Sequence, residues 1–219
     1  DPSLPDRIGE YTPTEKIGEG GFGVVYAATA PDGTAVAIKV LRPELSNNAE
    51  VRERLRREAI ASQAITSDRV ARVLDHDTEI ERPYIVMELV QGSTLTEHVA
   101  QHGPLAGAML TSVAVAMAEA LRDIQASGVL HRDLKPSNVM LGPDGIKILD
   151  FGIAAISEAA DFTQTGAVLG SASWMSPEQI TGVIVEASSD VFAMGLVLAF
   201  AALGHHPYGE GRPEALMYR

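Results

Sequence analysis

Residues 131–138 read HRDLKPSN, and residues 150–152 read DFG after a short apolar run. The first stretch brings a carboxylate (Asp133), a cation (Lys135) and an amide (Asn138) into one short loop. Transfer of a phosphoryl group needs a group that orients the attacking hydroxyl, a cation that neutralises the moving phosphate, and oxygen ligands for Mg²⁺. The three side chains can fill these roles in turn, and the aspartate of DFG offers a second oxygen ligand. A surface turn would explain either stretch alone, but not both together with the features described next.

The glycine spacing near the amino end is one of those features. Gly18, Gly20 and Gly23 form a G-x-G-x-x-G pattern, and glycines let backbone N–H groups approach phosphate oxygens that a side chain would push away. A glycine-rich hairpin turn is the alternative. A dinucleotide-binding fold would have a helix after the pattern, whereas the strand-forming residues 24–26 follow it here. The pattern therefore favours a β-hairpin lid over phosphates.

A lysine in an apolar strand is the next feature. Lys39 ends the run VAIK, and strand alternation would put it on the same face as Ala37, toward the predicted lid. A lysine in that position needs an anion, although an ordinary surface lysine is the alternative. Residues 49–65 predict a charged amphipathic helix. Glu58 lies near the buried face of that helix and is the predicted partner of Lys39, with Glu53 as the rival.

The coarse pattern of the chain predicts two lobes. Residues 11–40 hold short β-branched runs broken by glycine and proline turns, which predicts three strands. Further on, apolar residues repeat at helical spacing up to a stop at Gly128. We expect a β-rich lobe over about residues 8–90 and a mainly helical lobe over about residues 91–219, with a cleft between them.

Composition excludes several classes of protein. Lys and Arg number 17 against 29 Asp and Glu, and the resulting net charge of −12 argues against a nucleic-acid partner. The absence of cysteine excludes a disulfide scaffold and fits a cytoplasmic location. The longest apolar run, residues 191–203, falls short of the ~20 residues needed to cross a bilayer, so it predicts a helix buried in protein.

The motifs resemble those of the eukaryotic-like serine/threonine protein kinase family in its bacterial, receptor-type branch. They occur in the order of that family: glycine pattern, VAIK, HRD, DFG and finally SPE at residues 176–178. The resemblance covers nearly all of residues 1–219. It implies an α+β bilobal protein-kinase-like fold, with a small β-rich N-lobe carrying one regulatory helix and a mainly helical C-lobe whose C-terminal helices are absent. It also implies transfer of the γ-phosphoryl group of ATP to protein Ser and Thr hydroxyls, with Mg²⁺ as cofactor and Mn²⁺ as an alternative.

The resemblance also assigns nucleotide contacts. It implies that Met87 is the gatekeeper and that Glu88 and Val90 give backbone hydrogen bonds to adenine. The complete set of expected ATP contacts is Ile17, Gly18, Gly20, Gly23, Val25, Ala37, Lys39, Met87, Glu88, Val90 and Met140. The expected catalytic residues are Asp133, Lys135, Lys39 and Glu58, and the expected metal ligands are Asn138 and Asp150.

The stretch FTQTG (residues 162–166) resembles activation-loop sites that bacterial members of the family phosphorylate in themselves. Phosphorylation of Thr163 and Thr165 is therefore expected, with Arg132 as the partner of the phosphate. Ordinary solvated threonines are the alternative. Protein substrates are the expected partners, together with a homodimer for phosphorylation in trans.

Two other functions compete with the protein kinase interpretation. A pseudokinase-type nucleotide-binding interaction module would be expected to lack Lys39, Asp133 or Asp150, and all three are present. A small-molecule phosphotransferase of related fold would be expected to lack Lys135 and the SPE segment, and both are present.

Overall fold

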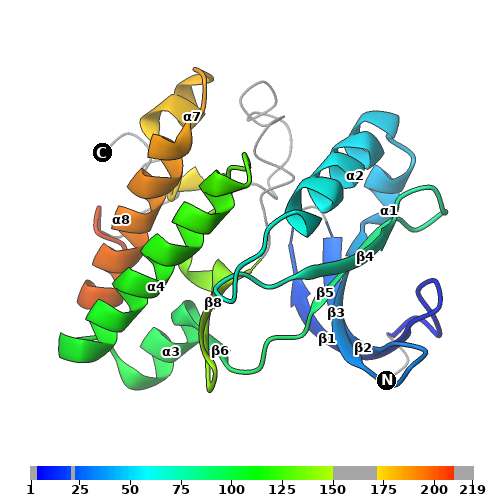
Figure 1. The fold of residues 1–219 in the computed structure, drawn as a ribbon, viewed down its shortest axis with the longest axis horizontal. Helices are drawn as coiled ribbons and strands as arrows, with labels where there is room; N and C mark the ends of the chain where they lie inside the picture. The colour runs from blue at the N-terminus through cyan, green and yellow to red at the C-terminus, as the bar shows by residue number, and fades with distance from the viewer. Residues whose placement is uncertain (1–3, 21–22, 150–171, 210–219) are drawn as a thin grey trace. The chain divides into compact units, whose positions relative to one another are not determined.

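The computed structural model describes residues 4–20, 23–149 and 172–209 and divides into two compact units (Figure 1). Unit 1 comprises Asp1–Ile65 and Ala71–Leu89, and unit 2 comprises Thr66–Val70 and Val90–Arg219. Thr66–Val70 lies inside the range expected for the first lobe but belongs to unit 2.

Unit 1 is built on a five-stranded antiparallel sheet in the order β1-β2-β3-β5-β4. The hairpin between β2 and β3 turns at Gly33, whose φ of 87° favours glycine, and the Asp32 carboxylate accepts a hydrogen bond from the Thr34 N–H. The strands are β1 (Thr12–Glu19), β2 (Gly23–Thr29), β3 (Ala35–Leu41), β4 (Val73–Asp77) and β5 (Tyr84–Glu88).

Two helices complete unit 1. The helix predicted over residues 49–65 is α2 (Ala49–Gln63), which packs against β4 (Figure 1). Asn48 caps its first turn by accepting hydrogen bonds from two backbone N–H groups. The short α1 (Pro43–Ser46) was not predicted, because four residues are too few to carry a helical period.

Unit 2 combines helices with a small three-stranded sheet in the order β6-β7-β8. The helix α4 lies alongside α8 and also packs against β8 (Figure 1). None of the helices in the described ranges is long and apolar enough to span a membrane. The elements are β6 (Ser93–Thr94), α3 (Leu95–His102), α4 (Gly107–Ala126), η1 (Pro136–Asn138), β7 (Val139–Gly142), β8 (Gly145–Ile148), α7 (Pro177–Thr181) and α8 (Ala187–Leu203).

The predicted helix over residues 191–203 falls inside α8, and its buried face comprises Ala193, Leu196, Val197 and Ala201. The helix α3 was not predicted. It starts at a capping box, in which Thr94 and Glu97 each accept a hydrogen bond from the other's backbone N–H.

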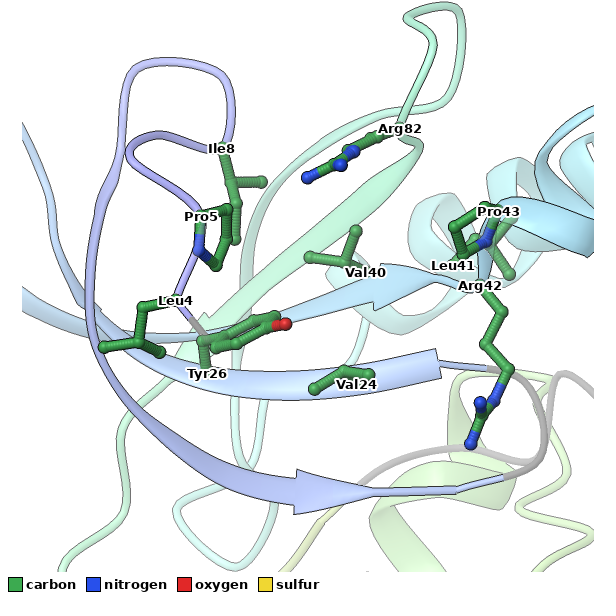
Figure 2. Close-up of a pocket in the computed structure, with 10 residues that line it drawn as sticks. All are labelled: Leu4, Pro5, Ile8, Val24, Tyr26, Val40, Leu41, Arg42, Pro43 and Arg82. Carbon is green, nitrogen blue, oxygen red and sulfur yellow. The ribbon is translucent and has the colours of Figure 1, made fainter. Parts of the chain in front are cut away.

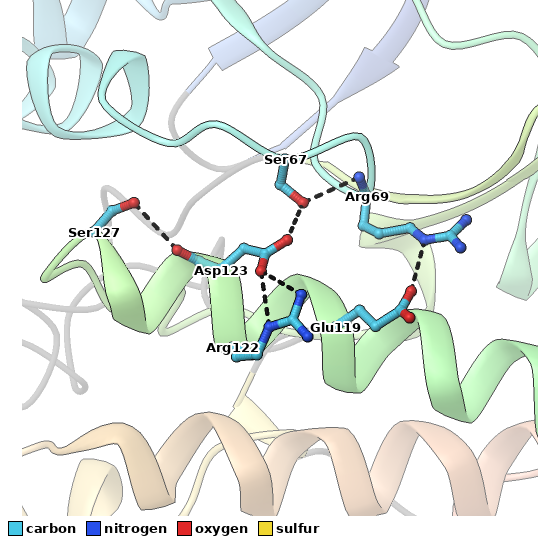
Figure 3. A network of polar contacts seen from close by, with 6 residues as sticks. All are labelled: Ser67, Arg69, Glu119, Arg122, Asp123 and Ser127. Carbon is cyan, nitrogen blue, oxygen red and sulfur yellow. Dashed lines mark hydrogen bonds and ion pairs between the residues drawn. The ribbon is translucent and has the colours of Figure 1, made fainter.

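Within unit 2, the segment Thr66–Val70 is bound by side chains to α4 (Figure 3) and by backbone to β8, where the Ile148 N–H donates to the Arg69 carbonyl oxygen at 2.8 Å. The Ser67 hydroxyl donates to Asp123 at 2.6 Å, and the Arg69 Nε donates to Glu119 at 3.0 Å. Hydrogen bonds from Ser67 and Arg122 lower the pKa of the Asp123 carboxyl. Because both acceptors lie on α4, this helix fixes Thr66–Val70 within unit 2.

Candidate active site

The loop at residues 131–138 is called the HRD loop below. A buried carboxylate binds its backbone. Asp190, at the start of α8, accepts hydrogen bonds from the backbone N–H groups of His131 and Arg132, each at 2.8 Å. The Asp190 side chain is buried, and so is the His131 ring, whose Nε2 lies 3.0 Å from the carbonyl oxygen of Leu149. Arg132 has a φ of 66°, an unusual value for a residue with a side chain. These buried hydrogen bonds stabilise an otherwise unfavourable backbone conformation.

Three predicted site residues meet in the HRD loop. The Lys135 ammonium donates to Asp133 Oδ2 at 2.6 Å, and the side chains of both residues are 23% exposed. The Asn138 amide nitrogen donates to the Asp133 carbonyl oxygen at 2.9 Å and to Oδ2 at 3.3 Å. The loop therefore presents a carboxylate that is oriented by its neighbours and accessible to a substrate hydroxyl.

Asn138 also has the chemistry of a ligand for a hard cation. Its amide nitrogen is turned toward Asp133, so its side-chain oxygen is the atom available to a metal such as Mg²⁺. The Leu149 N–H donates to the Asn138 carbonyl oxygen at 2.8 Å, which joins the end of β8 to the HRD loop. The other predicted ligand, Asp150, lies outside the described residues. Within the described ranges there is no group of three or more His, Cys, Asp or Glu side chains that could hold a metal.

In unit 1, the sheet brings predicted nucleotide contacts together by register. Val25 of β2 pairs with Lys39 of β3, and Ala37 pairs with Met87 of β5, so these side chains lie on neighbouring strands. Lys39 is half-buried between buried apolar neighbours. The Glu88 N–H donates to the Arg72 carbonyl oxygen at 2.9 Å, so a backbone bond from Glu88 to adenine would have to use its carbonyl oxygen.

The two candidate partners for Lys39 differ in their surroundings. Glu58 is half-buried on α2, next to the fully buried Ala59. The rival Glu53 is bound on its own helix by Arg56 and Arg57, each at 2.8 Å. Hydrogen bonds from these two guanidinium groups lower the pKa of Glu53 to about 2. Glu53 is therefore already paired, which favours Glu58.

Residues 18–23 are called the glycine segment below. Two of its glycines, Gly20 and Gly23, are explained by different physical reasons. A Cβ atom at Gly23 would lie 2.2 Å from the Val40 carbonyl oxygen, so packing against β3 alone demands glycine. At Gly20 a Cβ atom would meet nothing within 4 Å among the described neighbours. Gly20 is exposed, and its N–H donates to the Gly23 carbonyl oxygen at 2.9 Å. Packing explains Gly23, whereas Gly20 leaves space that a ligand can use.

The remaining predicted residues fall in three places. Ile17 and Gly18 lie in β1, and Val90 and Met140 lie in unit 2. Thr163 and Thr165 lie outside the described residues.

Comparison with known proteins identifies the family to which this arrangement belongs. The family model described as protein kinase domain matches residues 11–218. The chain belongs to the protein kinase family. The probable serine/threonine-protein kinase PkwA of Thermomonospora curvata is 41% identical over 207 residues, and the match covers 94% of this chain and 28% of that protein. The serine/threonine-protein kinase AfsK of Streptomyces coelicolor is 39% identical over 215 residues, covering 98% of this chain and 27% of that protein.

Solved structures agree with this family. The crystal structure of the Mycobacterium tuberculosis PknI kinase domain matches with a TM-score of 0.77 and 27% sequence identity, over 94% of this chain and 78% of that one. The predicted bilobal kinase fold is confirmed, with a β-rich unit and a mainly helical unit. The chain spans less than a third of the length of the curated relatives named above.

The SPE segment of this kinase domain is tied to the HRD loop. Ser176 caps α7 in a capping box with Gln179, and the Gln179 amide donates to the Arg132 carbonyl oxygen at 2.8 Å. The Glu178 carboxylate accepts a hydrogen bond from Ser189, which lowers the pKa of Glu178. The helix that follows the predicted activation loop is thus bonded to the loop that carries Asp133.

Sequence reasoning did not predict that Asp190 and Gln179 support the kinase site. Asp190 had one signal in the sequence, because it is an acid at the start of the apolar run 191–203 and such a carboxylate requires a buried donor.

Arg132 has a further property that only the structure shows. Its Nε atom is buried and has no hydrogen-bond partner within the described part of the chain.

Proposed function

We propose that this kinase domain transfers the γ-phosphoryl group of ATP to serine and threonine hydroxyls of protein substrates. The observation that carries the proposal is the hydrogen-bonded cluster of Asp133, Lys135 and Asn138 on the HRD loop. Serine/threonine-protein kinases that match at 38–41% identity over more than nine tenths of this chain support the same reaction.

In this proposal the HRD loop acts directly on the reacting groups. Asp133 orients the attacking hydroxyl and accepts its proton, and Lys135 neutralises charge on the phosphoryl group as it moves. Asn138 and Asp150 hold the divalent cation. That cation, Mg²⁺ or alternatively Mn²⁺, neutralises charge on the ATP phosphates when bound.

The residues of unit 1 position the nucleotide in the same proposal. Lys39 binds the α- and β-phosphates while paired with Glu58, and the glycine segment covers the phosphates with its backbone N–H groups. Val25 and Ala37 contact the adenine ring, with Met87 as the gatekeeper. The other ATP contacts predicted from the sequence belong to the proposal in the same way.

Regulation and location are further parts of the proposal. We expect autophosphorylation of Thr163 and Thr165, in trans within a homodimer, with the phosphate bound by Arg132. The buried Nε atom of Arg132 supports this role, because a phosphate would supply an acceptor. Mass spectrometry after incubation with Mg-ATP tests it, and phosphate found only at other residues would contradict it. A cytoplasmic location remains a prediction.

The test of the proposed function is a phosphotransfer assay with radiolabelled ATP, using a generic basic protein and a panel of metabolites as acceptors. We expect label on the protein alone, and a fall of at least ~10²-fold in kcat for Asp133→Asn with nearly unchanged ATP affinity. Asp144→Asn, in the exposed turn between β7 and β8, is the matched control and should keep full activity.

Two other results of this assay would each contradict the proposed protein kinase function. Label on a metabolite would establish a small-molecule phosphotransferase. ATP binding without any transfer would establish a nucleotide-binding interaction module.

A further inference from the structure

A pocket of about 320 Å³ opens in unit 1 where the N-terminal segment meets the sheet (Figure 2). Leu4 and Pro5 line it on one side, and Val24, Tyr26 and Val40 line it on the side of the sheet. Its volume is at the lower end of the roughly 300–1,000 Å³ typical of ligand sites. The pocket therefore suits one or two apolar side chains.

The pocket is separate from the proposed nucleotide contacts. Successive side chains of a strand point to opposite faces of its sheet. Val24 and Tyr26 therefore lie on the face opposite to Val25, and Val40 lies on the face opposite to Lys39. An occupant of the pocket would bind the face of the sheet opposite to Val25 and Lys39. The pocket meets the glycine segment at Arg42, which donates to the Gly20 carbonyl oxygen.

Two arginines line the rim of the pocket, and Arg82 supplies its positive charge because Arg42 is paired with Glu19. Arg82 extends from the turn before β5 toward Ile8 (Figure 2), and its exposed guanidinium forms no hydrogen bond or ion pair within the described ranges. Arg42 donates to Glu19 at 2.7 Å and to the Gly20 carbonyl oxygen at 3.0 Å, which uses two of its five N–H donors. The described residues that line the pocket include no Asp or Glu.

This local charge contrasts with the whole chain, whose net charge is −12. A two-fold dimer through this pocket would set Arg82 of one copy against the same arginine of the other, so like charges disfavour that form of self-association. An acidic partner would instead find its complement at Arg82, whose guanidinium can bind a carboxylate with two parallel hydrogen bonds.

We propose that this pocket docks a peptide segment of another protein, in which one or two apolar side chains are followed by acidic residues. The apolar side chains lie against Val24, Tyr26 and Val40, and a carboxylate binds Arg82. Docking gives this kinase domain a partner-binding site that is independent of its catalytic residues, so the inference goes beyond the proposed function.

The test is fluorescence anisotropy of a labelled peptide, Gly-Leu-Phe-Asp-Glu-Gly, titrated with the 219-residue chain in the absence of nucleotide. The matched peptide has lysines in place of the two acids. We expect the acidic peptide to bind at least about tenfold more tightly than the basic one, and Arg82→Glu to remove most of this preference. Arg57→Glu changes an exposed arginine on α2 to the same residue and should leave binding unchanged.

Three outcomes would overturn the proposal. These are equal affinity for the two peptides, equal effects of Arg82→Glu and Arg57→Glu, and no binding up to about 1 mM peptide. Light scattering accompanies the titration as a further check. A dimer that Arg82→Glu dissociates, in a chain that binds neither peptide, would identify a second copy as the occupant. Because no phosphotransfer is measured, these failures are distinguishable from a failure of the proposed function.

Discussion

The HRD loop and the glycine segment both depend on polar contacts, but only those of the HRD loop are buried. Asp190 and His131, which hold the HRD loop, are at most 1% exposed. The glycine segment is held by Arg42 and Glu19, whose side chains are 37% and 43% exposed. Exposed ion pairs are weak because water and salt compete for both partners, whereas an unpaired buried polar group is costly. The HRD loop is therefore fixed in one geometry, whereas the contact between Arg42 and Glu19 contributes little to stability.

The largest effect is expected from Asp190→Ala, which removes the acceptor beneath the HRD loop. The buried His131 N–H and the part-buried Arg132 N–H would lose their acceptor, and the buried one alone costs about 1–3 kcal/mol in the free energy of unfolding. Displacement of Asp133 should also lower kcat by about 10²-fold. Thermal unfolding and steady-state kinetics measure the two effects. Unchanged values of both would mean that the HRD loop does not depend on buried bonds.

The next effect concerns which glutamate of α2 serves the site. Glu58→Gln should lower kcat/KM by about ten- to a hundredfold, because the lysine that binds the phosphates would lose its orientation. Glu53→Gln is the matched variant and should keep nearly full activity, since Glu53 binds only Arg56 and Arg57 in the described structure. Kinetics that reverse this order would show that the helix presents the other glutamate to Lys39.

Two glycine variants separate packing from ligand approach within the glycine segment. Gly23→Ala should destabilise the fold by about 1–3 kcal/mol, since the new Cβ atom would meet the Val40 carbonyl oxygen. Gly20→Ala should leave the melting temperature unchanged and raise the KM for ATP. Calorimetry and kinetics on both variants test this. Equal melting temperatures for the two would contradict the packing explanation.

The smallest effect is expected from Arg42→Gln, which breaks the exposed contacts of the glycine segment. Glu19 lies at the surface, where its hydrogen bonds to Lys16 and Arg42 lower the pKa of its carboxyl. We expect no measurable change in melting temperature and less than about a threefold change in the KM for ATP. A large loss of stability would show that the exposed contacts of the glycine segment stabilise the fold as strongly as the buried contacts of the HRD loop.

The sequence by itself determined the family, the cluster of polar side chains on the HRD loop and several elements of the fold. Asp133, Lys135 and Asn138 are within five residues of one another, so their hydrogen bonds are local and their spacing already implies the cluster. The same holds for α2, whose helical period is visible in its residues, although the helix ends at Gln63 and not at residue 65. Local spacing is readable because the backbone geometry of a short segment has few alternatives.

Only the tertiary structure decided which distant groups support these segments. Asp190 is 59 residues from His131, and Ser67 is 56 residues from Asp123. A sequence contains many acids that could accept such hydrogen bonds, and only the packing of α4 and α8 selects among them. The structure also shows that Glu53 is paired with Arg56 and Arg57, whereas Glu58 as the partner of Lys39 stays a prediction. Pairing across long sequence separations depends on the free energy of the whole fold, and no local pattern encodes it.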